Sequence, residues 1–186
     1  MKQGIRILAL EDSPIKRNKP DSKCLLVGVV ARPDIIEGVL SFNVTVDGDD
    51  STQIIINKVK GSRFYDQIRL IAINGNTVAG MNVVDIGEVS KKLKMPLVAI
   101  TRKRPHPGKL KLSIKKACPK NYKTKAAILE RTAKNASVAR IGGYYVQFAG
   151  AKRVELRKHV SSCADLLRLA HIIASGISSG ESRGRL

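Results

Sequence analysis

The stretch Gly4–Ser13, GIRILALEDS, is a short apolar run that ends in two adjacent carboxylates, Glu11 and Asp12. Apolar side chains occupy both sides of its two-residue period, which is typical of a strand in the middle of a sheet that is covered on both faces. Pro14 cannot continue such a strand, so Asp12 is expected at its end. A carboxylate held there suits metal-dependent phosphodiester chemistry, but a surface acid at a turn has the same local sequence.

The segments around this stretch predict an α/β fold. Three N-terminal strands joined by short links favour an antiparallel meander, and they are expected at residues 4–13, 25–30 and 36–46. Later strands alternate with a helix, which predicts parallel pairing with right-handed crossovers. This second group comprises strands at 68–73 and 97–101 and a helix at 84–93.

The remaining segments are assigned from periodicity and from turn residues. In DGDDST, residues 47–52, the strand period breaks, and Asp50 or Ser51 is expected to cap a helix over 51–60. The C-terminal half is predicted to contain a helix at 108–117, a loop or insertion at 132–141, a strand at 143–148, a helix at 151–160 and a final helix at 165–179. The apolar stripe of that last helix is Leu166, Leu169, Ala170, Ile173 and Ile177.

The size and composition of the chain predict one globular domain over residues 1–186. No apolar run is judged long enough to cross a bilayer, and residues 1–20 show no signal-peptide core, so a cytoplasmic protein without membrane contact is expected. Its three cysteines lie far apart without a C-x-x-C pair, which predicts free thiols. The oligomeric state is left open.

Net charge is the strongest global signal. The chain carries 34 Lys and Arg against 15 Asp and Glu, a formal charge of +19. A fold does not require that excess of positive charge. Lys and Arg side chains bind the phosphates of a polyanion and release its counterions, so DNA or RNA is the predicted partner. An acidic protein surface, a small phosphorylated ligand, and a charge that serves solubility alone are the alternatives.

The positive charge is densest between Glu88 and Glu130, a stretch that contains no acid and that runs through Lys125. A solvated helix face is the ordinary explanation, but such a face usually carries compensating acids, so we predict a surface that follows a phosphate backbone. The predicted nucleic-acid-binding residues are Arg102, Lys103, Arg104, Lys109, Lys115 and Lys116. Aromatic residues are scarce here, which favours contact with the backbone over stacking on bases.

Acids at strand ends are the candidate metal ligands. They are Glu11 and Asp12, then Asp47, Asp49 and Asp50, then Asp85 before the helix at 84–93. Mg²⁺ and Mn²⁺ prefer oxygen ligands and keep several waters, so two or three carboxylates suffice for either ion. Each acid alone is more often a cap or a turn residue. No nucleotide-binding glycine motif, calcium loop or nucleophile elbow is present.

Four blocks of the sequence resemble a small, mostly archaeal family related to endonuclease V. They are LEDSP at 10–14, the segments LLVGVV and IEGVLSFNVTVDGDDST within 25–52, SRFYDQIRLIAINGNTVAGMNVVD at 62–85 and LLRLAHIIASGISSGESRGRL at 166–186. The resemblance implies a ribonuclease H-like fold. Such a fold has a mixed sheet of five or more strands, in which an antiparallel meander precedes parallel strands, with helices on both faces.

Endonuclease V is a Mg²⁺-dependent nuclease that acts at deaminated adenine, and the resemblance implies where its acids fall. Asp12 matches the first acid. The second falls in DGDDST, where Asp47 is the first choice and Asp50 the reserve. The third position is Asn74, where the nuclease has an aspartate, and an amide brings no charge to hold a metal.

Two other positions complete the implied site. Arg102 lies where the nuclease places a lysine, and His171 resembles a histidine or aspartate of its late helix. The sequence therefore predicts a nucleic-acid-binding protein with an altered Mg²⁺- or Mn²⁺-dependent nuclease site. Its predicted catalytic residues are Asp12, Asp47, Asn74 and His171, and its predicted metal ligands are Asp12, Asp47 and Asp50. The alternatives are a non-catalytic module that binds a nucleic-acid backbone, and an assembly subunit that docks an acidic protein.

Overall fold

The computed structural model describes residues 4–15 and 22–182. The strands are β1 (Arg6–Asp12), β2 (Lys23–Arg32), β3 (Ile35–Thr45), β4 (Ile68–Asn74), β5 (Thr77–Val78), β6 (Asn82–Val83), β7 (Leu97–Thr101), β8 (Ser137–Ile141) and β9 (Tyr144–Ala149). The helices are α1 (Ser51–Lys60), α2 (Ile86–Leu93), α3 (Pro107–Ala117), α4 (Tyr122–Asn135), α5 (Arg153–Leu156) and α6 (Val160–Ser179).

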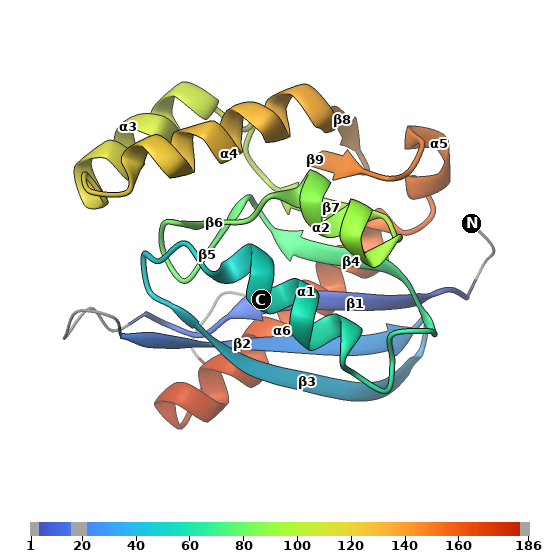
Figure 1. Cartoon of the computed structure of the whole chain (residues 1–186). Helices are drawn as coiled ribbons and strands as arrows, with labels where there is room; N and C mark the ends of the chain where they lie inside the picture. Colours follow the sequence, from blue (N-terminus) through green and yellow to red (C-terminus); the bar gives the residue numbers. More distant parts are fainter. Residues whose placement is uncertain (1–3, 16–21, 183–186) are drawn as a thin grey trace.

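Seven strands form one mixed sheet in the order β3-β2-β1-β4-β7-β9-β8. The first three strands pair antiparallel, and β1, β4 and β7 then pair parallel, as predicted. Strand β9 runs antiparallel to β7, and β8 closes that edge. Helices α1 and α2 cover one face of the sheet and α6 crosses the other, while α3 packs on α4 and α4 packs on α2 and β6 (Figure 1). The predicted α/β architecture with helices on both faces is confirmed.

The central strand β1 separates two hydrophobic cores. Leu8 and Leu10 pack on the side of α1 and α2. Ile7 and Ala9 pack on the opposite side, with the inner face of α6. Side chains alternate along a strand. Glu11 is therefore directed to the α6 side, like Ile7 and Ala9, and Asp12 to the α1–α2 side, like Leu8 and Leu10.

Two C-terminal predictions are wrong. Residues 132–141 are not a loop, because they hold the end of α4 and the edge strand β8. Residues 151–160 contain only the short α5, and α6 already begins at Val160. The first error has a physical reason. Helix α4 and strand β8 bury few residues, so their hydrophobic periods are weak.

Helix α6 also corrects the expectation about membrane spans. It is long and apolar enough to pass a test of length and composition, with a mean hydropathy of 1.3. Its inner face packs on β1, β2 and β4, which is the usual place of a core helix, and one such helix is weak evidence for a span. The buried face differs from the predicted stripe, since Ile177 is exposed and Cys163, Leu167 and Ala174 are buried.

Candidate functional site

A pocket of about 370 Å³ lies between α6 and the carboxyl ends of β1, β4 and β7. This edge is where ligands bind in open α/β sheets. Three residues that converge there come from three distant parts of the chain, namely Glu11, Asn74 and His171. The lining residues are Glu11, Asn74, Ile100, Thr101, Arg102, Tyr144, Ala164, Asp165, Leu167, Arg168 and His171.

Strand register brings Glu11 and Asn74 together. Leu10 pairs with Ile73 across β1 and β4, so the next residues of the two strands are neighbours on the same face. Asn74 Nδ2 donates a hydrogen bond of 3.0 Å to Glu11 Oε1. From α6, His171 Nδ1 lies 4.0 Å from the same oxygen, and His171 Nε2 lies 3.4 Å from the Ser175 hydroxyl.

The Glu11 carboxyl has an unusual affinity for protons. Its exposed fraction is 7%. Burial raises the pKa of Glu11 from 4.5 to about 8, the hydrogen bond from Asn74 opposes that rise, and the charge of Asp12 adds to it. Glu11 therefore carries a proton at neutral pH when no cation is beside it. A buried carboxyl with a raised pKa in a polar pocket is typical of a functional site.

Asp12 serves a different contact. Its Oδ2 accepts a 2.5 Å hydrogen bond from the backbone N–H of Ala79, in the turn between β5 and β6. Burial raises the pKa of Asp12, and the Ala79 hydrogen bond and the charge of His171 lower it. Asp12 does not line the pocket around Glu11. The structure therefore places Asn74 and His171 beside Glu11, and Asp12 outside the lining of that pocket but near enough for the charge of His171 to act on it.

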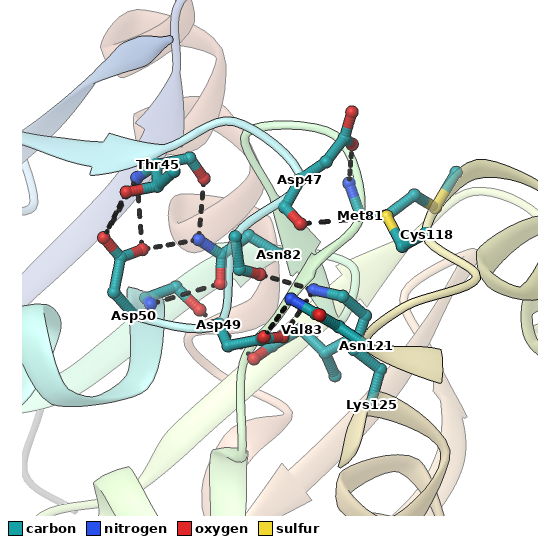
Figure 2. Close-up of polar contacts among 12 residues, drawn as sticks. Thr45, Asp47, Asp49, Asp50, Met81, Asn82, Val83, Cys118, Asn121 and Lys125 are labelled. Carbon is teal, nitrogen blue, oxygen red and sulfur yellow. Dashed lines mark hydrogen bonds and ion pairs between the residues drawn. The ribbon is translucent and has the colours of Figure 1, made fainter. Parts of the chain in front are cut away.

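Asp47 and Asp50 are engaged in the turn that joins β3 to α1 (Figure 2). Asp47 Oδ1 accepts from the Met81 N–H at 2.8 Å, and the Asp47 backbone is left-handed with φ of 54°. The Asp50 carboxylate accepts from the Thr45 N–H and hydroxyl and from Asn82 Nδ2. Burial opposes the shift, but the Thr45 and Asn82 hydrogen bonds lower the pKa of Asp50.

Two predictions concern this turn. Asp50 stands at the N-cap of α1, but its side chain makes no capping hydrogen bond to the helix. Neither Asp47 nor Asp50 lines the pocket around Glu11. Within residues 4–15 and 22–182, no three His, Cys, Asp or Glu side chains form a group that could hold a metal ion. Asp12, Asp47 and Asp50 all accept hydrogen bonds from other residues, and metal binding by these three acids stays a prediction.

Asp85 and Asp49 also have structural partners. Asp85 caps α2 by accepting from the Glu88 N–H, and Arg131 of α4 binds its other carboxylate oxygen at 2.8 Å. Asp49 lies 2.7 Å from Lys125 Nζ, and Lys125 also donates to the Gly48 carbonyl (Figure 2). Asp49 and Asp85 therefore anchor α4 to the loops before α1 and α2.

Lys125 was expected on the basic surface, but its exposed fraction is 0%. We expect Lys125→Ala to lower the free energy of unfolding by about 2–3 kcal/mol, because it leaves Asp49 without its cation and removes packing under α4. Lys123→Ala removes the same charge from an exposed position of the same helix and is the matched control. Urea unfolding of both variants measures the difference, and equal losses would contradict the anchoring role.

The six predicted nucleic-acid-binding cations are all exposed. Arg102, Lys103 and Arg104 follow β7, and the remaining three lie on α3. Arg102 lines the pocket around Glu11, next to Arg168. Across the described part of the chain, none of the six forms an ion pair with an acid. Their charges are therefore available to an external anion.

The pocket contains residues that the sequence did not single out. Glu11 is one of the acids at strand ends but is not among the predicted site residues, and Asp165 and Arg168 lie outside the apolar stripe predicted for the final helix. The spacing of three residues between 165, 168 and 171 was the available signal, because such residues line one side of a helix. No local pattern in the sequence showed that Glu11 faces the pocket, since either Glu11 or Asp12 could be directed toward α6.

The family of the chain follows from comparison with known proteins. A model of the endonuclease dU family matches residues 3–178. The chain belongs to the endonuclease dU family. A UPF0215 protein of Methanothermobacter thermautotrophicus is 39% identical over 191 residues, which cover 99% of this chain and 93% of that one. A UPF0215 protein of Archaeoglobus fulgidus is 33% identical, with 97% of each chain covered.

Solved structures confirm the fold of this endonuclease dU family member. A protein of unknown function from Archaeoglobus fulgidus superposes with a TM-score of 0.83 at 31% identity, over 95% of this chain and 99% of that one. Human endonuclease V superposes with a TM-score of 0.53 at 10% identity, over 92% and 83%. The predicted ribonuclease H-like fold and the predicted relation to endonuclease V are confirmed.

Proposed function

We propose that this protein is an endonuclease whose reaction site is the pocket around Glu11, Asn74 and His171. One observation carries the proposal. A buried carboxyl, an amide and an imidazole converge at the carboxyl ends of the parallel strands, with the guanidinium groups of Arg102 and Arg168 lining the same pocket. Acid–base groups beside anion-binding groups suit phosphodiester hydrolysis.

The residues of the pocket fit a magnesium ion that keeps much of its water. The carboxylate of Glu11 and the amide oxygen of Asn74 are the oxygen ligands that Mg²⁺ prefers. Glu11 and Asn74 could hold such an ion only if waters and a substrate phosphate supplied its other ligands. An ion bound there supplies Lewis-acid polarisation of the phosphodiester and a more acidic water.

The side chains of the pocket have distinct roles in this proposal. Glu11 would hold the cation through its carboxylate, which has to lose its proton to do so. Asn74 orients Glu11 through its hydrogen bond. Arg102 and Arg168 bind the phosphate, because guanidinium donors match phosphate oxygens. His171, whose side chain is 40% exposed, is placed to exchange a proton with water or a phosphate oxygen.

The names of the relatives support DNA with a deaminated base as the substrate. The matching family is described as endonuclease dU, which names deoxyuridine. A Ciona intestinalis endonuclease V with a TM-score of 0.52 at 8% identity was solved in complex with a 23mer DNA containing an inosine followed by a ribo-adenosine. Uracil and hypoxanthine are the deamination products of cytosine and adenine.

Cleavage assays test the proposal. Labelled oligonucleotides that carry one deoxyuridine, one deoxyinosine or no lesion are incubated with the protein and Mg²⁺ or Mn²⁺. We expect cleavage of a lesion-bearing strand that EDTA abolishes. If the protein binds these strands with submicromolar affinity but cuts none of them, the proposal fails and the non-catalytic binding module remains.

Asn74→Asp is expected to tighten Mg²⁺ binding about tenfold, because it adds a second charged oxygen beside Glu11. Isothermal titration calorimetry of the two proteins with MgCl₂ measures the change. Asn76→Asp adds the same charge two residues later, outside the residues that line this pocket, and is the control. No gain in Asn74→Asp over that control would remove Asn74 from the ligand set.

The basic surface has its own test. The double variant Lys115→Ala, Lys116→Ala is expected to reduce the slope of log K against log salt for DNA binding by about 2, one unit for each phosphate that the protein no longer neutralises. Lys58→Ala, Lys60→Ala removes the same charge from exposed positions on α1 and serves as the control. An unchanged slope in the α3 variant would show that nucleic acid does not follow α3.

A further inference from the structure

Strand β3 lies at an outer edge of the sheet, with β2 on one side (Figure 1). Within the described residues no strand pairs with its other side. An open edge offers backbone donors and acceptors to another chain, so natural edge strands are usually short or carry Lys or Pro. Strand β3 is 11 residues long and contains no Lys, Arg or Pro. It is therefore an edge without the usual protection.

The contacts of Thr45 show which backbone groups of β3 face outward. The Thr45 N–H donates to the Asp50 carboxylate at 3.1 Å and not to β2. The direction of these groups alternates along an antiparallel strand, so the N–H and C=O groups of residues 39, 41 and 43 face outward as well. Asp50 closes the end of the edge, and its middle is open to a partner.

The opposite edge of the sheet is better protected. Strand β8 has five residues and carries Arg140. The Arg140 carbonyl accepts a hydrogen bond of 3.2 Å from Arg153 Nη2. A short strand with a cation and a side chain bonded to its backbone is a poor template for pairing. The two edges therefore differ, and only β3 has the features of a pairing strand.

Two exposed apolar side chains lie along β3. Val39 is 47% exposed and Ile36 is 56% exposed. They pair across the sheet with Val29 and Ala31, which pack under α6. Exposed apolar residues that continue a buried cluster are typical of an interaction surface. A chain laid along β3 would shield both side chains from water.

The charge pattern favours a second copy of this chain as the partner. Residues 33–57 contain five acids and no Lys or Arg, although the whole chain carries a formal charge of +19. Two copies of so cationic a protein repel each other where their basic surfaces meet, so they can approach most easily along β3. Glu37 adds no free charge there, because Arg6 and Arg32 both bind it.

We infer that two copies of the chain pair through their β3 strands, antiparallel and about a twofold axis at Ser41. An antiparallel edge is self-complementary under such an axis, because the same patch meets itself. In this register Val39 lies opposite Asn43 of the second copy, and outward groups on each strand meet outward groups on the other. The two sheets then form one continuous sheet, with both α6 helices on the same face.

The ends of this pair are complementary in charge. Arg63 is exposed, and its guanidinium lies 4.8 Å from the centre of the Phe64 ring, which packs against Gly38. Phe64 belongs to the same core as α1, whose first turn Asp50 precedes. In the antiparallel register Gly38 lies opposite position 44 of the second copy. Each Arg63 is therefore brought to the end of the other β3 where Asp50 lies.

Sedimentation equilibrium tests the inference. We expect the protein to have twice the 20.3 kDa mass of one chain. Ser41→Lys places two like charges opposite each other at the axis, so it should weaken the dimer by about fivefold or more. Ser137→Lys adds the same charge at an exposed position of the other edge strand and should leave the dimer unchanged. Equal melting temperatures show that both variants are folded.

A cysteine at the axis tests the register. In an antiparallel pair the Cα atoms of hydrogen-bonded partners are about 5.5 Å apart, a separation that a disulfide spans. Ser41→Cys should therefore form a covalent dimer on mild oxidation, which non-reducing electrophoresis detects. Ser137→Cys is the control, and Cys24, Cys118 and Cys163 are buried and should not cross-link.

The outcomes are decisive and do not depend on the nuclease, because Ser41 does not line the pocket around Glu11. A parent protein that stays at the mass of one chain up to about 100 µM overturns the inference. A dimer that Ser41→Lys leaves intact, or one that Ser137→Lys weakens equally, overturns it as well. A dimer weakened by Ser41→Lys alone and cross-linked through Ser41→Cys alone supports it.

Discussion

Glu11→Gln is expected to reduce the cleavage rate of a lesion-bearing oligonucleotide by a factor of about 100 or more. The variant keeps the shape of the side chain and an oxygen that accepts from Asn74, but it can neither release a proton nor carry a negative charge. Single-turnover kinetics with excess protein measure the effect. The affinity for the uncleaved strand in EDTA should stay within about threefold, because the cations that bind phosphate are unchanged.

Asp12→Asn is the matched control for this prediction. Asp12→Asn removes the charge of the carboxylate next to Glu11, whose side chain is directed to the opposite face of the sheet. The Ala79 N–H still has an acceptor in this variant, because asparagine also provides a side-chain oxygen. We expect most of the cleavage rate to remain in Asp12→Asn. If Asp12→Asn abolishes cleavage and Glu11→Gln does not, the site lies on the α1–α2 side of the sheet, as the resemblance to endonuclease V implied.

The contribution of Glu11 to the stability of the protein should fall as the pH rises from about 4.5 to about 8. Its pKa is 4.5 when unfolded and about 8 in the fold, because burial disfavours the charged form. In this range the folded state binds more protons than the unfolded state, so the free energy of unfolding decreases with pH. This loss in the free energy of unfolding is absent below the pKa of Glu11 in the unfolded chain and complete above its pKa in the fold. It reaches at most about 5 kcal/mol.

Glu11→Gln isolates this effect, because every other titrating group is shared by the two proteins. Urea unfolding in EDTA at pH 5 and pH 8.5 should show a variant that is more stable than the parent at pH 8.5, by up to about 5 kcal/mol, and of similar stability at pH 5. Identical pH profiles would show that the Glu11 carboxyl is not buried at a cost. Stability and cleavage are therefore expected to change in opposite directions in this variant.

The order of the elements could be predicted from local pattern. The alternation along β3, the apolar runs of β1 and β7 and the helix signals around α1 and α2 are strong, since each buries a face of its own. The edge strand β8 and the polar helix α4 were missed, because each buries too little to set a clear period. Family blocks in the sequence also led to the relation with endonuclease V that the comparisons confirm.

The candidate site was harder to predict, because residue type does not say what a side chain binds. DGDDST has the composition of a cation site, but Asp47 accepts a hydrogen bond from Met81, and Asp50 accepts from Thr45 and Asn82. Met81 and Asn82 are more than 30 residues away in the sequence. Lys125 belongs to a basic run, but it is buried against Asp49. Such contacts join residues up to 77 positions apart, so no local window contains them.

The linear order of residues was enough to establish strands, helices, net charge and family, since each depends on neighbours in the chain or on overall composition. Which carboxylate enters the pocket was decided only by packing. Glu11 and Asp12 are adjacent and therefore face opposite sides of β1, and the side that becomes a pocket is the one on which α6 places His171. The pairing of β1 with β4 then brings Asn74, 63 residues away, to the same oxygen.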